Sequence, residues 1–267
     1  MFKHAVKQIE KSKLNIKPFP YFKVNNLIPV KNLQNLNKAL PGFKEIAGED
    51  ILFQSTSQTK KTMLPSSAIY KKLKKNKNFK NINLLFQKIK PAVLKKFDQS
   101  IKKYVKKKYQ QSKLSYHSTF NVMRKGYIKS AHIDRRDHLV HVLFYPSSDS
   151  TKGGKIRIMK MKKHKKTYDV FPSKKDLSLA SSYSVKNNFC LFTLNVPWSY
   201  HEVSKYYGKK DRKYFYAVYD FPIEEVGSKI KNRKKGFNKN PFWTSKVSVK
   251  SQNRKKTFFS EIIFQGS

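Results

Sequence analysis

His132 and Asp134 have the residue types and the spacing of a metal-binding pair. They stand in SAHID, a short run of alternating polar and apolar residues that favours a β-strand. Residues i and i+2 of a strand point to the same side of a sheet, so this imidazole and this carboxylate should lie next to each other. Both groups are common ligands of transition metals.

A second histidine, His201, follows 67 residues after Asp134, on a further strand-like segment behind a turn at Pro197-Trp198. Two imidazoles and one carboxylate on one face of an octahedral ion leave three adjacent positions open, which is the ligand set of non-heme Fe(II) oxygenases. The sequence therefore predicts that His132, Asp134 and His201 are both the metal ligands and the catalytic centre.

The elements that must position these ligands are short β-strands. Between residues 114 and 222, runs rich in β-branched and aromatic residues are separated by turn residues, and no helical pattern interrupts them. Many strands without helices between them indicate a barrel or a sandwich rather than a βαβ fold. The runs are YHSTFNVMR, YIKSAHID, HLVHVLFY, GKIRIMKM, NFCLFTLNV, YHEVSK and RKYFYAVYDF.

The segments before this core favour helices and one strand. Residues 18–30 predict a strand with a turn, and residues 32–40 predict a helix that Pro41-Gly42 ends. Residues 79–109 carry an apolar stripe at helical spacing, so we expect an amphipathic helix that Pro91 either kinks or splits into two.

The chain therefore divides into three parts. Residues 1–110 supply an N-terminal strand and helices that pack on the core, with a loop expected at 50–66. Residues 111–222 form the core itself. Residues 223–267 are a basic C-terminal extension, rich in Lys, Asn and Ser.

The strand-rich half resembles the Fe(II)/2-oxoglutarate-dependent oxygenases, in particular their prolyl-4-hydroxylase-like branch. The resemblance extends over residues 18–222 and rests on MRKGYIKSAHID, HVLFYPSS, GGKIRI and HEV…DRKYFYAVYDF, in this order. It implies a mainly β fold with flanking helices around a double-stranded β-helix (jelly-roll or cupin-like) core. It also implies a dioxygenase that uses Fe(II), 2-oxoglutarate and O2 and hydroxylates a C–H bond, with succinate and CO2 as co-products.

The same resemblance places Arg212, eleven positions after the distal histidine, on the far carboxylate of 2-oxoglutarate. Lys213 is the alternative, because strand alternation turns only one of these two neighbours inward. Tyr145 matches a position whose hydroxyl binds the same carboxylate in relatives; the other interpretation is an ordinary half-buried strand tyrosine.

The chain departs from the family at Met123, where relatives often have a tyrosine that donates a hydrogen bond to 2-oxoglutarate. Asn121 and Tyr127 are the neighbours that can replace it.

The other histidines are not expected to be ligands. The i, i+3 spacing of His138 and His141 predicts that they point to opposite faces of a strand. His4, His117 and His164 have no partner residues at a spacing that would indicate a metal site.

The charge of the chain supports a second hypothesis. The sequence has 59 Lys and Arg against 16 Asp and Glu, a formal net charge of +43, and 52 of the cations are lysine. Such a surface attracts polyanions, so the alternative function is a non-catalytic basic jelly-roll that binds nucleic acid or another polyanion. An oxygenase that acts on such a polymer combines both hypotheses, and a peptide or a small molecule is an equally compatible substrate. The lysine content also fits an AT-rich coding sequence.

Composition sets the remaining expectations. Cys190 is the sole cysteine, which excludes an intrachain disulfide and favours a reducing cytoplasm. No apolar run reaches 18 residues, so we expect no membrane span. The high like charge opposes self-association and favours a monomer.

Overall fold

The computed structural model describes residues 1–47, 58–63, 67–105, 114–134, 138–148, 152–163 and 167–221, together with a short strand at 248–250. The α-helices within these residues are α1 (Phe2–Lys11), α2 (Val30–Ala39), α3 (Phe43–Ala47), α5 (Ala68–Lys74), α6 (Lys77–Lys96) and α7 (Asp98–Tyr104). The strands are β1 (Tyr21–Asn25), β2 (Lys60–Met63), β3 (Ser115–Met123), β4 (Lys129–His132), β5 (His138–Ser147), β6 (Ile156–Met161), β7 (Thr167–Asp169), β8 (Leu177–Tyr183), β9 (Phe189–Leu194), β10 (His201–Val203), β11 (Arg212–Asp220) and β12 (Ser248–Lys250).

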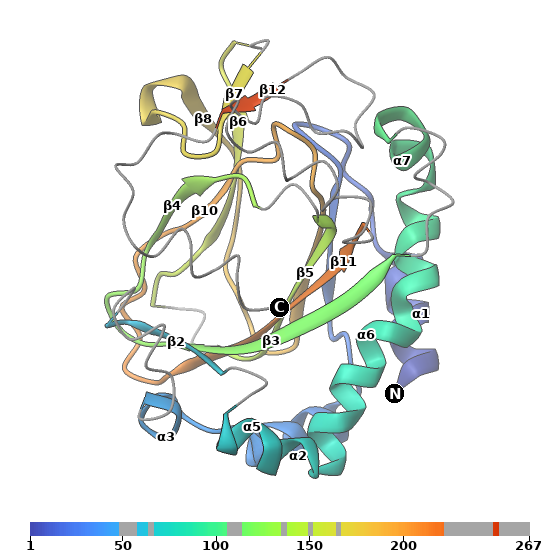
Figure 1. The fold of residues 1–267 in the computed structure, drawn as a ribbon, viewed down its shortest axis with the longest axis vertical. Helices are drawn as coiled ribbons and strands as arrows, with labels where there is room; N and C mark the ends of the chain where they lie inside the picture. The colour runs from blue at the N-terminus through green and yellow to red at the C-terminus, as the bar shows by residue number, and fades with distance from the viewer. Residues whose placement is uncertain are drawn as a thin grey trace, which may run out of the picture.

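Two antiparallel sheets face each other. The large sheet has the order β1-β9-β5-β11-β3-β2 and the small sheet the order β4-β10-β6-β8 (Figure 1). From β3 onward the chain passes repeatedly from one sheet to the other, because β3, β5, β9 and β11 belong to the large sheet and β4, β6, β8 and β10 to the small one. This alternation is the jelly-roll arrangement of a double-stranded β-helix, and it confirms the fold expected from the sequence.

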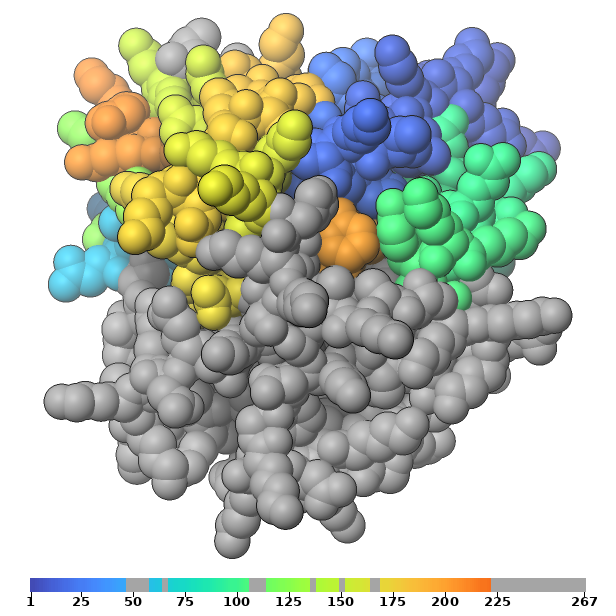
Figure 2. Space-filling model, turned by 90° about the horizontal axis from the view of Figure 1, so that it is seen from above, coloured from blue at the N-terminus to red at the C-terminus, as the bar shows by residue number. Residues whose placement is uncertain are grey.

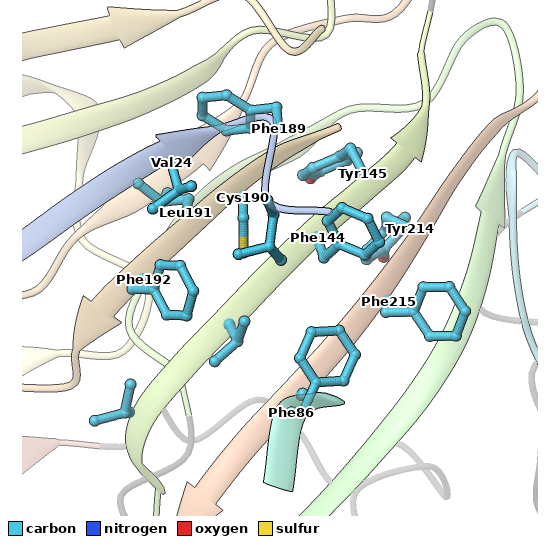
Figure 3. Close-up of a cluster of buried hydrophobic side chains, with 14 of the residues drawn as sticks. Val24, Phe86, Phe144, Tyr145, Phe189, Cys190, Leu191, Phe192, Tyr214 and Phe215 are labelled. Carbon is cyan, nitrogen blue, oxygen red and sulfur yellow. The ribbon is translucent and has the colours of Figure 1, made fainter. Parts of the chain in front are cut away.

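Helix α6 covers the outer face of the large sheet (Figure 1). Its buried Phe86 packs against Phe144 of β5 and Phe215 of β11, with ring centroids 6.2 and 6.1 Å apart (Figure 3). The Tyr219 hydroxyl donates a 2.7 Å hydrogen bond to the carbonyl of Phe86. The main core of the protein therefore lies between this helix and the sheet.

The N-terminal segment extends both the sheet and its helical cover. Strand β1 pairs with β9, and the Phe22 ring stacks on Phe192 at 4.5 Å. Helix α1 contacts α6, and Lys96 donates a hydrogen bond to the carbonyl of Glu10. Seen from above, the N-terminal residues (blue) lie between the green helical residues and the yellow to gold strands (Figure 2).

Several elements differ from the sequence expectations. Helix α6 continues through Pro91, which lies on the exposed side, and the next helix begins only at Asp98. Residues 60–63, expected in a loop, form β2 and pair with β3. Helix α1 and strand β8 were not expected. The basic extension lies outside the described residues except for β12, which pairs in parallel with β7. None of the described helices combines the length and the apolar character that crossing a membrane requires.

Replacing Phe86 with Ala should lower the free energy of unfolding by about 3–5 kcal/mol, because it removes a fully buried ring from between helix and sheet. Chemical denaturation measures this. The control is Leu179→Ala, at an apolar side chain that is 55% exposed, which should change stability by less than about 0.5 kcal/mol. Equal effects of the two substitutions would contradict this packing.

Candidate metal centre

His132, Asp134 and His201 meet in the interior between the two sheets. His132 ends β4 and is the direct cross-strand partner of His201, the first residue of β10. Their rings lie 4.4 Å apart between centroids. The Asp134 carboxylate lies 3.4 Å from His132 Nε2 and 3.3 Å from His201 Nε2. The structure therefore brings the three expected ligands together, with one donor atom of each within 4.8 Å of the others.

Strand alternation directs these side chains inward. The residues between and beside the ligands point to the opposite side of the small sheet, where they form a second, smaller apolar cluster. Its buried members are Ala131, Ile133, Met161, Leu177 and Tyr200. Burial of these apolar neighbours therefore fixes which way His132, Asp134 and His201 face.

Each ligand histidine is oriented by the backbone carbonyl of the residue two positions before it. Nδ1 of His132 contacts the carbonyl of Ser130 at 2.8 Å, and Nδ1 of His201 contacts the carbonyl of Ser199 at 3.1 Å. Since a carbonyl only accepts, Nδ1 of both rings carries a proton, and Nε2 is the nitrogen that faces Asp134. This is the tautomer that binds a metal through Nε2.

Charge in the centre is concentrated on Asp134. Burial acts to raise the pKa of its carboxyl, but the neighbouring His141 and His201 and the contact with His132 hold that pKa well below its usual range. Burial and the neighbouring His201 lower the pKa of His132. For His201, burial acts to lower the pKa, and the Asp134 charge outweighs it and raises the pKa. Asp134 is therefore an anion and His132 a neutral ligand.

His141 is a third imidazole at this carboxylate, with Nδ1 3.1 Å from Asp134 Oδ2. The expectation that His138 and His141 face opposite ways was wrong, since His138 Nδ1 lies 3.0 Å from His141 Nε2. The reason is a bulge in β5: Tyr219 and Asp220 of β11 pair with Val140 and His138, which leaves one extra residue between them and reverses the alternation.

Arg212 lies fully buried under Gly153-Gly154, in the connection that leads from the large sheet into β6. Its guanidinium donates to the Gly154 carbonyl at 2.5 Å and to the Gly153 carbonyl at 3.2 Å, and it lies over the Tyr206 ring at 4.3 Å. Both glycines have positive φ, and a Cβ on Gly154 would collide with the guanidinium. Gly154 thus makes room for the arginine.

Lys213 turns the other way. Its ammonium donates a 2.6 Å hydrogen bond to the carbonyl of Leu40, outside the barrel, and partial burial lowers its pKa. Met123 is buried and is the cross-strand partner of Arg212. The amide of Asn121 is bound to Thr62 and Thr119.

Three buried tyrosines lie near these charged groups, Tyr145 near Arg212 and Tyr127 and Tyr214 near Asp134. The Tyr145 ring stacks on Tyr214 at 5.3 Å (Figure 3). Burial raises the pKa of Tyr145, and the nearby Arg212 opposes this in part. Burial also raises the pKa of Tyr127 and Tyr214, and the negative charge of Asp134 adds to both shifts. All three hydroxyls therefore keep their protons and are able to donate hydrogen bonds to an anion.

Sequence reasoning missed two residues near these side chains, Tyr214 and Lys60. Tyr214 stands two positions after Arg212 on the same strand, so alternation alone could have assigned it to the same face. Lys60 of β2 lies 5.9 Å from the centre of the Tyr214 ring. No signal pointed to it, because its segment was expected to be a loop.

The donor set fits Fe(II). Two ligands bound at right angles to one ion with bonds of roughly 2.1 Å lie about 3 Å apart, and two distances here are 3.3 and 3.4 Å. Two Nε2 lone pairs and one charged carboxylate suit a first-row transition ion.

No protein-family model and no curated protein matches the sequence. Among solved structures, the chain is similar to a Pseudomonas putida prolyl-4-hydroxylase, with 9% identity, a TM-score of 0.47 and coverage of 82% of this chain and 99% of that chain. A prolyl 4-hydroxylase from Phytophthora capsici is 11% identical with a TM-score of 0.49, and the match covers 84% of this chain and 66% of that chain. A non-heme α-ketoglutarate-dependent carbocyclase from nogalamycin biosynthesis is 10% identical with a TM-score of 0.45, and the match covers 83% of this chain and 84% of that chain. The structural neighbours are prolyl 4-hydroxylases and other 2-oxoglutarate- and Fe(II)-dependent oxygenases, the superfamily that the sequence resembles.

Replacing Gly154 with Ala should displace the Arg212 guanidinium and strain a backbone at φ +60, which costs about 1–3 kcal/mol of stability. Thermal unfolding measures the loss. Gly42→Ala is the matched control, because a Cβ there meets only the side-chain ends of Asp211 and Glu45. A Gly154→Ala variant as stable as the control would show that the arginine does not depend on this glycine.

Proposed function

We propose that the chain is an Fe(II)- and 2-oxoglutarate-dependent dioxygenase that hydroxylates a C–H bond of its substrate. One observation carries the proposal. A metal-ligand triad and a fully buried arginine face the same interior, with protonated tyrosine hydroxyls near them. A dianion that binds a metal at one end and a cation at the other matches this arrangement of charges.

His132, Asp134 and His201 would hold Fe(II) on one face and leave adjacent positions for the co-substrates. When bound, Fe(II) supplies the oxidising chemistry that couples decarboxylation of 2-oxoglutarate by O2, giving succinate and CO2, to insertion of an oxygen atom into a C–H bond. The carbonyls of Ser130 and Ser199 keep both imidazoles in the ligating tautomer.

Arg212 would bind the far carboxylate of 2-oxoglutarate. Its planar guanidinium forms paired charge-assisted hydrogen bonds, which are strong in a site shielded from water. Its position supports this role over Lys213, whose ammonium is engaged at Leu40. The hydroxyls of Tyr127, Tyr145 and Tyr214 would donate to the same anion and replace the tyrosine that is absent at position 123.

The binding-module hypothesis explains less of the interior. A protein that binds polyanions through surface lysines needs neither a carboxylate half-buried among imidazoles nor a buried arginine. Burying either charge is costly unless it is paired and hydrogen-bonded. Asp134 and Arg212 both lie inside the barrel, where they do not contribute to a polyanion-binding surface of lysines.

Anaerobic addition of Fe(II) and 2-oxoglutarate should produce the weak visible charge-transfer band of a chelated complex. His132→Ala should abolish the band, because it removes a ligand. Arg212→Ala should raise the 2-oxoglutarate concentration needed for half of the band by roughly 10- to 100-fold, since hydrogen bonds to a charged group are lost. Absorption titration measures both effects.

Lys213→Ala is the matched control, because it removes a cation one residue away that points out of the barrel. Arg212→Lys, which keeps the charge, should recover part of the affinity. A folded wild-type protein without the band would refute the oxygenase function and leave polyanion binding as the alternative. A band weakened by Lys213→Ala rather than Arg212→Ala would refute the assignment of the arginine.

A further inference from the structure

A second cluster of metal-ligating side chains lies on the large sheet, apart from the triad. It consists of His117 on β3, His138 on β5 and Asp220 on β11, with one donor atom of each within 4.8 Å of the others. The expectation that His117 has no partner residues was therefore wrong. His164 lies outside the described residues.

The cross-strand register brings these three residues together. Asp220 is the direct partner of His138, and His117 is opposite Val218, two positions from Asp220 on the same face of β11. The bulge in β5 turns His138 toward this face. Three neighbouring strands thus each contribute one donor, so the arrangement is held by the sheet and not by a loop.

Of the two distances between the histidine nitrogens and the Asp220 oxygens, one is shorter and one is longer than the ligand separation at a metal site. Ligands of a tetrahedral ion with bonds of roughly 2.0–2.1 Å lie about 3.3 Å apart. His117 Nδ1 lies 2.6 Å from Asp220 Oδ2, and His138 Nε2 lies 3.7 Å from Asp220 Oδ1. The first distance is that of an ion pair, while the second exceeds a hydrogen bond. A modest turn of the carboxylate would equalise them around an ion.

Groups behind His138 fix the orientation of its ring. Its Nδ1 lies 3.0 Å from His141 Nε2 and 3.1 Å from the Tyr216 hydroxyl, so Nε2 is the nitrogen that faces Asp220. The rings of His141 and Tyr216 stack at 5.7 Å. Metal-bound histidines are held in this manner through their second nitrogen.

Burial and access also suit a metal ion. Asp220 and His138 are only 5% and 3% exposed, so their donor atoms are shielded from solvent. The His117 side chain is 48% exposed, which gives an ion a path from solvent and a position for water. Two imidazoles and one carboxylate suit zinc-like ions, whereas Ca²⁺ and Mg²⁺ prefer oxygen ligands only.

We propose that His117, His138 and Asp220 bind a divalent transition-metal ion of the zinc class, at a second site independent of the His132–Asp134–His201 centre. His141 lies between the two sites, in contact with Asp134 on one side and His138 on the other.

The test is the Zn(II) stoichiometry of the metal-free full-length protein, measured by competition with a chromophoric chelator. Wild-type protein should bind two ions, and His132→Ala and His117→Ala should each bind one. The double variant should bind none. His4→Ala removes a histidine on α1 outside both clusters and should still bind two. His117 is half exposed, so its replacement should leave the fold intact.

The outcomes separate the two sites. Two ions in both wild-type and His117→Ala protein, or no ion in His132→Ala protein, would refute the second site and leave the oxygenase proposal intact. One ion in wild-type protein that is lost in His117→Ala but kept in His132→Ala would support the second site and count against the triad. As a second readout, Co(II) added to His132→Ala protein should show the ligand-field bands of a four-coordinate site. The conservative Asp220→Asn substitution should weaken those bands.

Discussion

The contact of the half-buried Asp134 carboxylate with the imidazoles of His132, His141 and His201 is the interaction on which the interior depends. A charge in this position is stable only while its partners are held in place. Pairing of β4 with β10 holds two of them, and pairing of β5 with its neighbours in the large sheet holds the third. The two sheets of the jelly-roll therefore hold three imidazoles around one carboxylate.

The two faces of strand β11 carry side chains of different polarity. Phe215 and Tyr219 face helix α6, while Arg212, Tyr214 and Asp220 belong to the opposite face. The apolar face supplies stability, and the inner face carries a series of polar groups from Arg212 to the second cluster, His117, His138 and Asp220. Burial of the first face offsets the cost of keeping polar groups on the second.

Local patterns were sufficient to predict a strand-rich barrel or sandwich and to place His132 and Asp134 on one face of a strand, because alternation along a strand is a property of neighbouring residues. The double-stranded β-helix topology was implied only by the resemblance to the oxygenases. The same rule of alternation predicted that only one of Arg212 and Lys213 turns inward, and the structure shows that it is Arg212. The contact between His138 and His141 did not follow from this rule, since the bulge in β5 arises from its register with β11 and not from its own residues. Strand β8 escaped notice because its sequence, LSLASSY, has one buried side chain, Leu177, and thus no apolar alternation.

The most direct measurement is a crystal structure of the protein grown anaerobically with Fe(II) and 2-oxoglutarate. We expect anomalous density for iron at bonding distance from His132 Nε2, His201 Nε2 and the Asp134 carboxylate. The co-substrate should chelate that iron and place its far carboxylate on the Arg212 guanidinium. Iron bound elsewhere, or 2-oxoglutarate that contacts Lys213 instead of Arg212, would contradict the account.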